Sequence, residues 1–90
     1  MSRIERIKEK LQVLSPLRLE VDNESARHAG HGGDDGSGES HLTIHLVTKV
    51  FEGMPRLVRQ RRVHELLHEE METGLHALSL DLKTPGEDMN

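Results

Sequence analysis

The chain has 90 residues, a formal net charge of −4 at pH 7, and no cysteine, tryptophan or tyrosine. A chain of this length forms one domain and buries about 60–65% of its unfolded surface, so aliphatic side chains must supply nearly all of the core. The negative charge disfavours sequence-independent binding of DNA, which requires a basic surface. Without cysteine, this chain offers neither disulfides nor thiolate ligands, and without a long apolar run we expect a cytoplasmic protein that does not contact membranes.

A first helix is predicted near the N-terminus. Ser2 and Glu5 match a capping box, in which each side chain accepts a hydrogen bond from the backbone N–H of the other residue. Pro16 ends the helix because its ring cannot continue the hydrogen-bonded ladder. Between these signals, apolar residues recur every three or four positions and form one stripe, namely Ile4, Ile7, Leu11 and Leu14.

Two strands are predicted next, on either side of a long loop. Apolar and polar residues alternate over 17–22 and again over 41–48, which is typical of half-buried strands. The range 23–40 contains five glycines and many polar residues, so we expect it to be a mobile loop. The residues expected to face the core are Leu17, Leu19, Val21, Leu42, Ile44 and Leu46.

A second helix and a third strand complete the domain. Pro55 suits the first turn of this helix, and Gly74 suits the position just after its end, near residue 72. Leucines alternate with other residues over 78–82, and we expect the tail 86–90 to fray. The residues expected on or near the buried face of the helix are Leu57, Val58, Val63, Leu66, Leu67 and Met71.

The order helix, strand, strand, helix, strand predicts a single α+β domain over residues 1–90. The first two strands would form an antiparallel hairpin, and the second and third would be parallel through a right-handed crossover that contains the helix. A small three-stranded mixed sheet with the helices on one face buries all the apolar stripes.

Five segments of the chain, together with the arginine-rich start of the second helix, resemble the BolA family over about residues 3–85. They are Ser-Ala-Arg-His-Ala-Gly-His at 25–31, Glu-Ser-His-Leu at 39–42, Phe-Glu-Gly at 51–53, Gly-Leu-His-Ala-Leu-Ser-Leu at 74–80 and Thr-Pro at 84–85. The sub-type with a loop histidine and no cysteine is the most similar. The chain departs from the usual pattern at Gln60, where the family commonly has histidine, and at Leu42, where it commonly has phenylalanine.

The resemblance implies a fold related to type II KH modules and an adaptor function. Family members pair with monothiol glutaredoxins and share a [2Fe–2S] cluster held by the glutaredoxin cysteine, a glutathione thiol and two ligands from the BolA protein. Those two ligands correspond here to His76 and to one of His28 and His31, with no cluster expected in the isolated chain. Some members are described as DNA-binding transcription regulators, which is the alternative function.

The histidines also have simpler explanations. By alternation, His76 lies on the same strand face as the leucines of the last strand, so it is either a core residue or a ligand at the end of the strand. His28 and His31 are either incidental residues of a solvated loop or candidate ligands, and with His76 they could bind Zn²⁺ or Ni²⁺. We expect His64 and His68 to lie on a solvated helix face, and His41 and His45 to face solvent or a helix edge.

A dense basic cluster lies at the start of the second helix. It is either a solvated helix start, a docking patch for an acidic partner or for glutathione carboxylates, or a nucleic-acid contact. Cations in a first helical turn oppose the helix dipole, which suggests a use other than stability. No glycine-rich phosphate loop, nucleophile elbow or carboxylate pair is present, so we do not expect an enzyme. The cluster is Arg56, Arg59, Arg61 and Arg62.

Overall fold

The first helix begins where the sequence predicts. In the computed structural model, which describes residues 1–25 and 38–89, Ser2 and Glu5 form the expected capping box ahead of α1 (Arg3–Leu11). A 3₁₀ turn, η1 (Gln12–Leu14), extends α1, and the chain then turns at Ser15, whose φ of 49° is left-handed. Leu17 was predicted to face the core from the first strand, and this prediction is wrong. The residue precedes β1 (Arg18–Asn23) and is 61% exposed.

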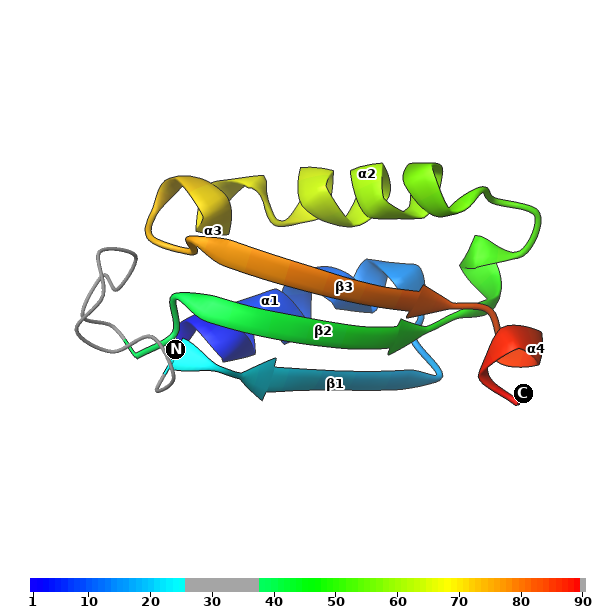
Figure 1. The fold of residues 1–90 in the computed structure, drawn as a ribbon, viewed down its shortest axis with the longest axis horizontal. Coiled ribbons are helices and arrows are strands. Elements are labelled where there is room, and N and C mark those ends of the chain that lie inside the picture. The colour runs from blue at the N-terminus through cyan, green and yellow to red at the C-terminus, as the bar shows by residue number, and fades with distance from the viewer. Residues whose placement is uncertain (26–37, 90) are drawn as a thin grey trace.

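The sheet has the predicted topology (Figure 1). β1 pairs antiparallel with β2 (His41–Val47), and β2 pairs parallel with β3 (Ala77–Lys83). The connection from β2 to β3 contains the short turn η3 (Lys49–Phe51), then α2 (Arg56–Leu66) and α3 (His68–Glu72). The α+β class with a three-stranded mixed sheet is therefore confirmed.

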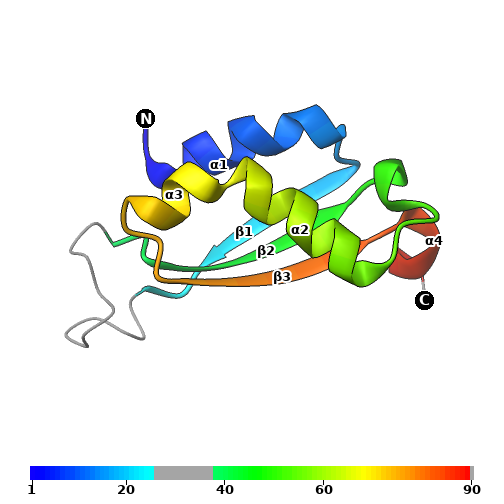
Figure 2. The same ribbon diagram turned by 90° about the horizontal axis from the view of Figure 1, so that it is seen from above.

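The helices α1, α2 and α3 lie on one face of the sheet, as Figure 2 shows. Between them and the sheet is a core of aliphatic side chains around Phe51, which is fully buried. No helix in residues 1–25 and 38–89 has the length and apolar character needed to span a membrane. The core cluster is Ile7, Leu11, Leu14, Leu42, Ile44, Leu46, Phe51, Val63, Leu67, Leu75 and Leu82.

The crossover helix differs from the prediction in two ways. It is interrupted at Leu67, which has φ −103° and ψ 10°, so that α2 and α3 are separate helices. Leu57 and Val58, expected in the core, are 59% and 41% exposed. The buried face instead contains Arg59, Val63, Leu67 and Glu70, which recur at helical spacing. The predicted face was misplaced because the prediction counted only apolar residues. The actual buried face has a charged residue at each end, Arg59 and Glu70.

Glu70 is the buried anion to which α1 is attached. Its side chain is 1% exposed, and its two oxygens accept hydrogen bonds from Arg3 at 3.0 Å, from Arg6 at 3.0 Å and from Lys10 at 2.9 Å. The hydrogen bond from Arg6 is the main cause that lowers the pKa of Glu70 to about 2. The pair of α1 and α3 is thus held by an ion cluster as well as by apolar packing.

The C-terminal tail contains a short helical turn that the sequence did not predict. Thr84 and Glu87 form a second capping box, which starts α4 (Pro85–Asp88). The Oε1 atom of Glu87 also accepts a hydrogen bond of 2.6 Å from Arg59. The capping box satisfies the backbone N–H groups of Thr84 and Glu87 at the start of this turn.

The sheet face opposite the helices carries a histidine between two carboxylates. His45, in the central strand β2, contacts Asp81 of β3 through Nδ1 at 2.9 Å and Asp22 of β1 through Nε2 at 3.0 Å. The hydrogen bond with Asp81 is the main cause that raises the pKa of His45. The same contact lowers the pKa of Asp81. A protonated imidazole at this position donates to one strand on each side.

We predict that Glu70→Gln lowers the free energy of unfolding by about 3 kcal/mol, because it removes the negative charge of the buried carboxylate that pairs with Arg3, Arg6 and Lys10. Since the folded-state pKa of Glu70 is depressed, its contribution is present above pH 4.5 and is lost as the pH falls toward about 2. Urea denaturation at pH 7 and across the acid range measures both effects. Glu69→Gln, at an exposed neighbour, should change stability by less than about 0.5 kcal/mol; equal midpoints for the two variants would contradict the prediction.

We predict that His45 stabilises the fold in its protonated form. Because its folded-state pKa is raised, this stabilisation is complete below the ordinary value of 6.5 and is lost as the pH rises through the higher folded value. An NMR titration of the imidazole and the pH dependence of stability should both show this, and His45→Gln should remove the slope. His64→Gln is the matched control, and titration of His45 at or below 6.5 would argue against the prediction.

Candidate functional site

The parallel pairing of β2 and β3 brings the first residues of both strands to one end of the sheet. His41 opens β2 and pairs in register with Ala77, the first residue of β3. His76 immediately precedes that strand. The carbonyl oxygen of Ser40 accepts hydrogen bonds from the backbone N–H of His76 at 2.9 Å and of Ala77 at 3.1 Å. Backbone hydrogen bonds therefore fix the position of His76 relative to β2.

His76 is exposed, whereas its neighbour Leu75 is 2% exposed and belongs to the core. The alternative in which His76 is a core histidine therefore does not hold. The alternation that placed it with the leucines of β3 does not apply to His76, because this residue lies before the first residue of the strand. Its role as a metal ligand stays a prediction.

The two ends of the 23–40 segment are anchored beside the same position. The Ser25 hydroxyl oxygen accepts hydrogen bonds from the backbone N–H of Ser40 at 2.8 Å and of His41 at 3.1 Å. The Asn23 side-chain amide donates to the Gly38 carbonyl at 2.7 Å. Ser25 and Ser40 are both buried. The chain thus leaves the sheet at Ser25 and returns to it next to the backbone that holds His76.

Two of the three predicted cluster ligands, His28 and His31, lie outside the described residues. Their assignment, and the choice between them, stays a prediction. Among residues 1–25 and 38–89, no group of three or more histidine, aspartate or glutamate side chains is arranged to hold a metal ion. His64 and His68 are both exposed, as expected, but they lie on the separate helices α2 and α3, and His68 forms an ion pair with Glu72.

The structure also brings together a pair of histidines that the sequence analysis did not join. The rings of His41 and His76 have centroids 6.4 Å apart, with an interplanar angle of 32°. His41 is half-buried, and its Nδ1 lies 2.8 Å from the Ser40 hydroxyl. A signal was available in the sequence, because a histidine opens the second strand and another precedes the third. The predicted parallel pairing of those strands places their starts side by side.

The basic cluster divides into one internal and three exposed arginines. Arg59 is 5% exposed; it donates to the carbonyls of Met54 at 2.8 Å and Leu82 at 3.2 Å, and to both carboxylate oxygens of Glu87. Its guanidinium also lies 5.7 Å from the centroid of the Phe51 ring. This buried arginine is therefore not available as a contact for a partner or a nucleic acid, and its prediction as one is wrong.

The contact with Arg59 is the main cause that lowers the pKa of Glu87 to about 2. The remaining members of the cluster are exposed along α2, namely Arg56, Arg61 and Arg62.

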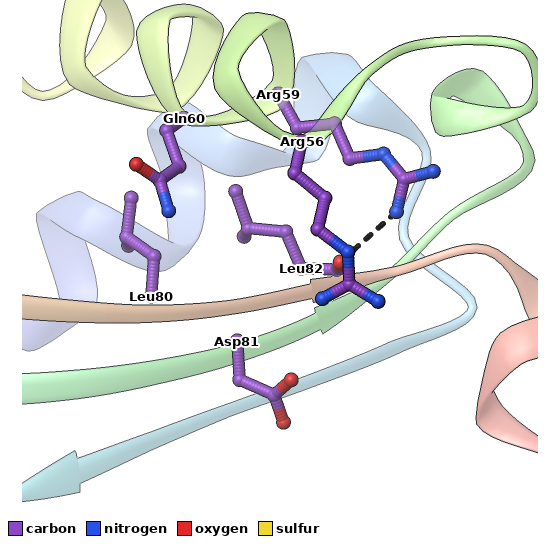
Figure 3. A pocket seen from close by; sticks show the side chains of 6 residues that line it. All are labelled: Arg56, Arg59, Gln60, Leu80, Asp81 and Leu82. Carbon is purple, nitrogen blue, oxygen red and sulfur yellow. Dashed lines mark hydrogen bonds between the residues drawn. The ribbon is translucent and has the colours of Figure 1, made fainter.

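A small pocket separates the start of α2 from β3 (Figure 3). Arg56, Gln60 and Asp81 are among its lining residues, and the dashed line in Figure 3 marks the hydrogen bond from Arg59 to the Leu82 carbonyl. Its volume is about 50 Å³, well below the roughly 300–1,000 Å³ of pockets that bind small organic ligands. This pocket is too small for a substrate, and the end of the sheet around His76 is the better candidate site.

The fold agrees with a family comparison. The BolA family, described as "BolA-like protein", matches residues 11–87 of the chain. The chain belongs to the BolA family.

Relatives of different length share this domain. A Sinorhizobium protein described as "Uncharacterized protein in cobS 5'region" is 47% identical over 89 residues, which cover 97% of this chain and 96% of that protein. The chloroplastic protein BOLA1 of Arabidopsis thaliana is also 47% identical over 89 residues, covering 96% of this chain but 56% of the relative. The chain therefore spans nearly all of one relative and about half of the other.

Solved structures show the same fold. BolA1 from Arabidopsis thaliana has a TM-score of 0.87 with this chain at 47% identity, covering 97% of this chain and 96% of the other. The BolA domain of SufE1 from the same plant has a TM-score of 0.84 at 43% identity, covering 97% and 96% of the two chains. The fold therefore occurs both in BolA1 and as a domain of a SufE protein.

We predict that Arg59→Ala lowers the free energy of unfolding by about 2 kcal/mol, because it breaks a partly buried ion pair and removes the hydrogen bonds to two backbone carbonyls. Arg62→Ala, on the exposed side of the same helix, should change it by less than about 0.5 kcal/mol. Thermal and urea unfolding measure both variants. If Arg59→Ala had wild-type stability but bound a partner less tightly, Arg59 would be a partner contact and the prediction would be wrong.

Proposed function

We propose that this BolA-family domain is an adaptor that forms a heterodimer with a monothiol glutaredoxin and co-ligates a [2Fe–2S] cluster. The observation that carries the proposal is the exposed His76, held by the Ser40 carbonyl at the end of the sheet where the segment 26–37 begins and ends. The family resemblance supplies the identity of the partner and the cluster. The proposed role is iron–sulfur cluster trafficking or iron sensing, without enzymatic activity.

The donor chemistry of this chain fits half of a cluster site. Neutral imidazole is a suitable ligand for iron, and His76 presents one at an exposed, backbone-anchored position. The chain has no cysteine, so the thiolates of the proposed site would come from the glutaredoxin and from glutathione. When bound, the cluster would supply one-electron redox chemistry, with a potential that histidine ligation raises relative to all-cysteine clusters.

The second ligand proposed for this chain is His28 or His31. Anchoring of Ser25 and Ser40 supports this choice, because the chain departs from and returns to the backbone next to His76. His28 is three residues after Ser25 and His31 is six residues after it. A segment of three residues spans at most about 10 Å and a segment of six about 20 Å, so the length of the chain permits either histidine to reach the site.

The exposed arginines Arg56, Arg61 and Arg62 are the proposed contact for the acidic groups of the partner or of glutathione. Charge complementarity of this kind speeds association more than it strengthens the final complex. DNA binding by the arginine-rich helix stays a prediction, and with Arg59 committed to the interior only three cations of the cluster remain for it. The negative formal charge of −4 also opposes it.

The test is co-expression with a monothiol glutaredoxin, followed by visible circular dichroism of the purified complex. We expect a heterodimeric [2Fe–2S] spectrum for the wild type and its loss in His76→Ala, because this variant removes the proposed imidazole ligand. His64→Ala, at an exposed histidine on α2, should keep the wild-type spectrum. Far-UV circular dichroism should show that both variants fold, as expected for exposed residues.

Two results would contradict the proposal. The absence of any wild-type heterodimer with bound cluster would remove the glutaredoxin partnership. A folded His76→Ala complex with an unchanged visible spectrum would keep the partnership but exclude His76 as a ligand. Separate His28→Ala and His31→Ala variants then identify the loop ligand as the one whose loss changes the spectrum.

A further inference from the structure

β1 is an edge strand, and its outer side has no neighbour among the described strands. The sheet order is β1-β2-β3, and Figure 1 shows β1 as the outermost strand. The backbone N–H of Glu24 donates to the His41 carbonyl of β2, so by alternation the backbone groups of Leu19 and Val21 point to the outer side. Such an edge is a template for pairing with another chain. We propose that β1 pairs antiparallel with β1 of a second copy of this chain.

The other edge of the sheet, at β3, is covered by a helix. The Lys83 carbonyl accepts a hydrogen bond from Thr48 and so faces β2, which turns the Leu82 carbonyl outward. Arg59 of α2 donates to that carbonyl at 3.2 Å, and α2 runs along this side of the sheet in Figures 1 and 2. A helix over an edge prevents strand pairing. By contrast, no residue of β1 is buried, so β1 is the edge at which a second chain can be added.

The apolar side of β1 is incompletely covered by its own chain. Leu19 and Val21 pack against the core but are only half-buried, and Leu17, just before the strand, is 61% exposed. When the pair of strands is centred on Leu19, Leu17 of one copy approaches Val21 of the other. The second strand thus removes from water the parts of these side chains that α1 leaves exposed, which stabilises the pair.

The charged side of β1 selects the same register. With Leu19 opposite Leu19 of the second copy, each Arg18 lies opposite a Glu20. Opposite charges across an antiparallel pair are stabilising, and like charges are destabilising. Centring the pair on Glu20 instead places the two Glu20 side chains opposite each other, and centring it on Val21 places Glu20 opposite Asp22. Only the register centred on Leu19 therefore combines apolar contact on one face with opposite charges on the other.

Arg18 and Glu20 are available for these contacts. Their side chains are 49% and 52% exposed, and they already form an ion pair of 3.1 Å within the chain. Two copies in the register centred on Leu19 bring two such pairs together with alternating sign. Each guanidinium then lies between the carboxylate of its own chain and that of the second copy.

This pairing leaves the candidate ligand site free. His76 is held by Ser40, just before β2, and the neighbouring end of β1 is Asn23, which pairs with Leu42. Asn23 is four residues from Leu19, or about 13 Å along a strand. Because the two β1 strands are antiparallel, the two copies of His76 lie at opposite ends of the joined sheet. The inference therefore does not depend on the proposed glutaredoxin partnership.

The experiment is sedimentation equilibrium of the isolated chain up to about 1 mM, because an interface formed by one short strand is small and weak. We expect the average mass to rise toward that of a dimer. Arg18→Glu and Glu20→Arg each place like charges opposite one another and should raise the Kd of the dimer about tenfold or more. The double variant Arg18→Glu/Glu20→Arg restores opposite charges and should return the Kd to within about threefold of the wild-type value. Glu65→Arg, the same charge change at an exposed residue of α2, should associate as the wild type does.

An NMR dilution series of the wild type locates the contact without any variant. The backbone N–H resonances of Leu19 and Val21 should shift with concentration, whereas that of Leu80 in β3 should not. Three results would overturn the inference: a chain that stays monomeric at about 1 mM, concentration-dependent shifts centred on β3, and a folded double variant that associates as weakly as the single variants. Far-UV circular dichroism identifies the variants that fold. None of these results affects the cluster test, which uses the glutaredoxin complex and its visible spectrum.

Discussion

The buried face of the crossover helices has one charged residue at each end, Glu70 and Arg59. These two charges attach α1 and α4 to the crossover helices. At one end, Glu70 binds the cations of α1. At the other, Arg59 binds Glu87 and the Leu82 carbonyl, and so holds α4 and the end of β3. Buried ion pairs cost free energy through desolvation, and only partners with good geometry compensate for that cost. A small core with one aromatic residue therefore depends on complete pairing of these groups.

This arrangement determines what the exposed surface can offer to a partner. Arg59 belongs to the densest basic segment of the chain, but its side chain points into the protein. Its N–H groups donate hydrogen bonds to internal partners, including the Met54 carbonyl and Glu87. Arg56, Arg61 and Arg62 remain exposed on the same helix. A segment with four arginines thus presents fewer cations to a partner or to DNA than its sequence suggests, because a helix buries one residue in every three or four.

The parallel pairing of β2 and β3 brings the candidate functional residues together at one end of the sheet. A parallel pair requires a crossover, and the crossover returns the chain to the same end of the sheet at which β2 began. His41, His76 and the anchors Ser25 and Ser40 therefore meet at one end, although they are distant in sequence. The opposite end carries Arg59 and α4, so the structural ion pair and the candidate ligand His76 are separated along the sheet.

The order of the elements, the capping box at Ser2, the mixed sheet and the inward-facing residues of β2 were all predictable from the sequence. These features depend on local spacing and on turn residues, which act over a few positions. The family resemblance also predicted that His76 is a cluster ligand, and this role stays a prediction. It misplaced Leu17, Leu57 and Val58, because an apolar residue near the end of an element is buried only if another element covers it.

Which charged residues are internal, and which histidines are neighbours, depends on contacts between distant parts of the chain. Arg59 and Glu70 take core positions because Glu87 and the cations of α1, from distant parts of the chain, neutralise them. The tail is ordered for the same reason, since Arg59 binds the glutamate that caps α4. The pairing of His41 with His76 likewise results from contact between two strands. Burial of a charge depends on its partner in space, and local sequence spacing contains no information about that partner.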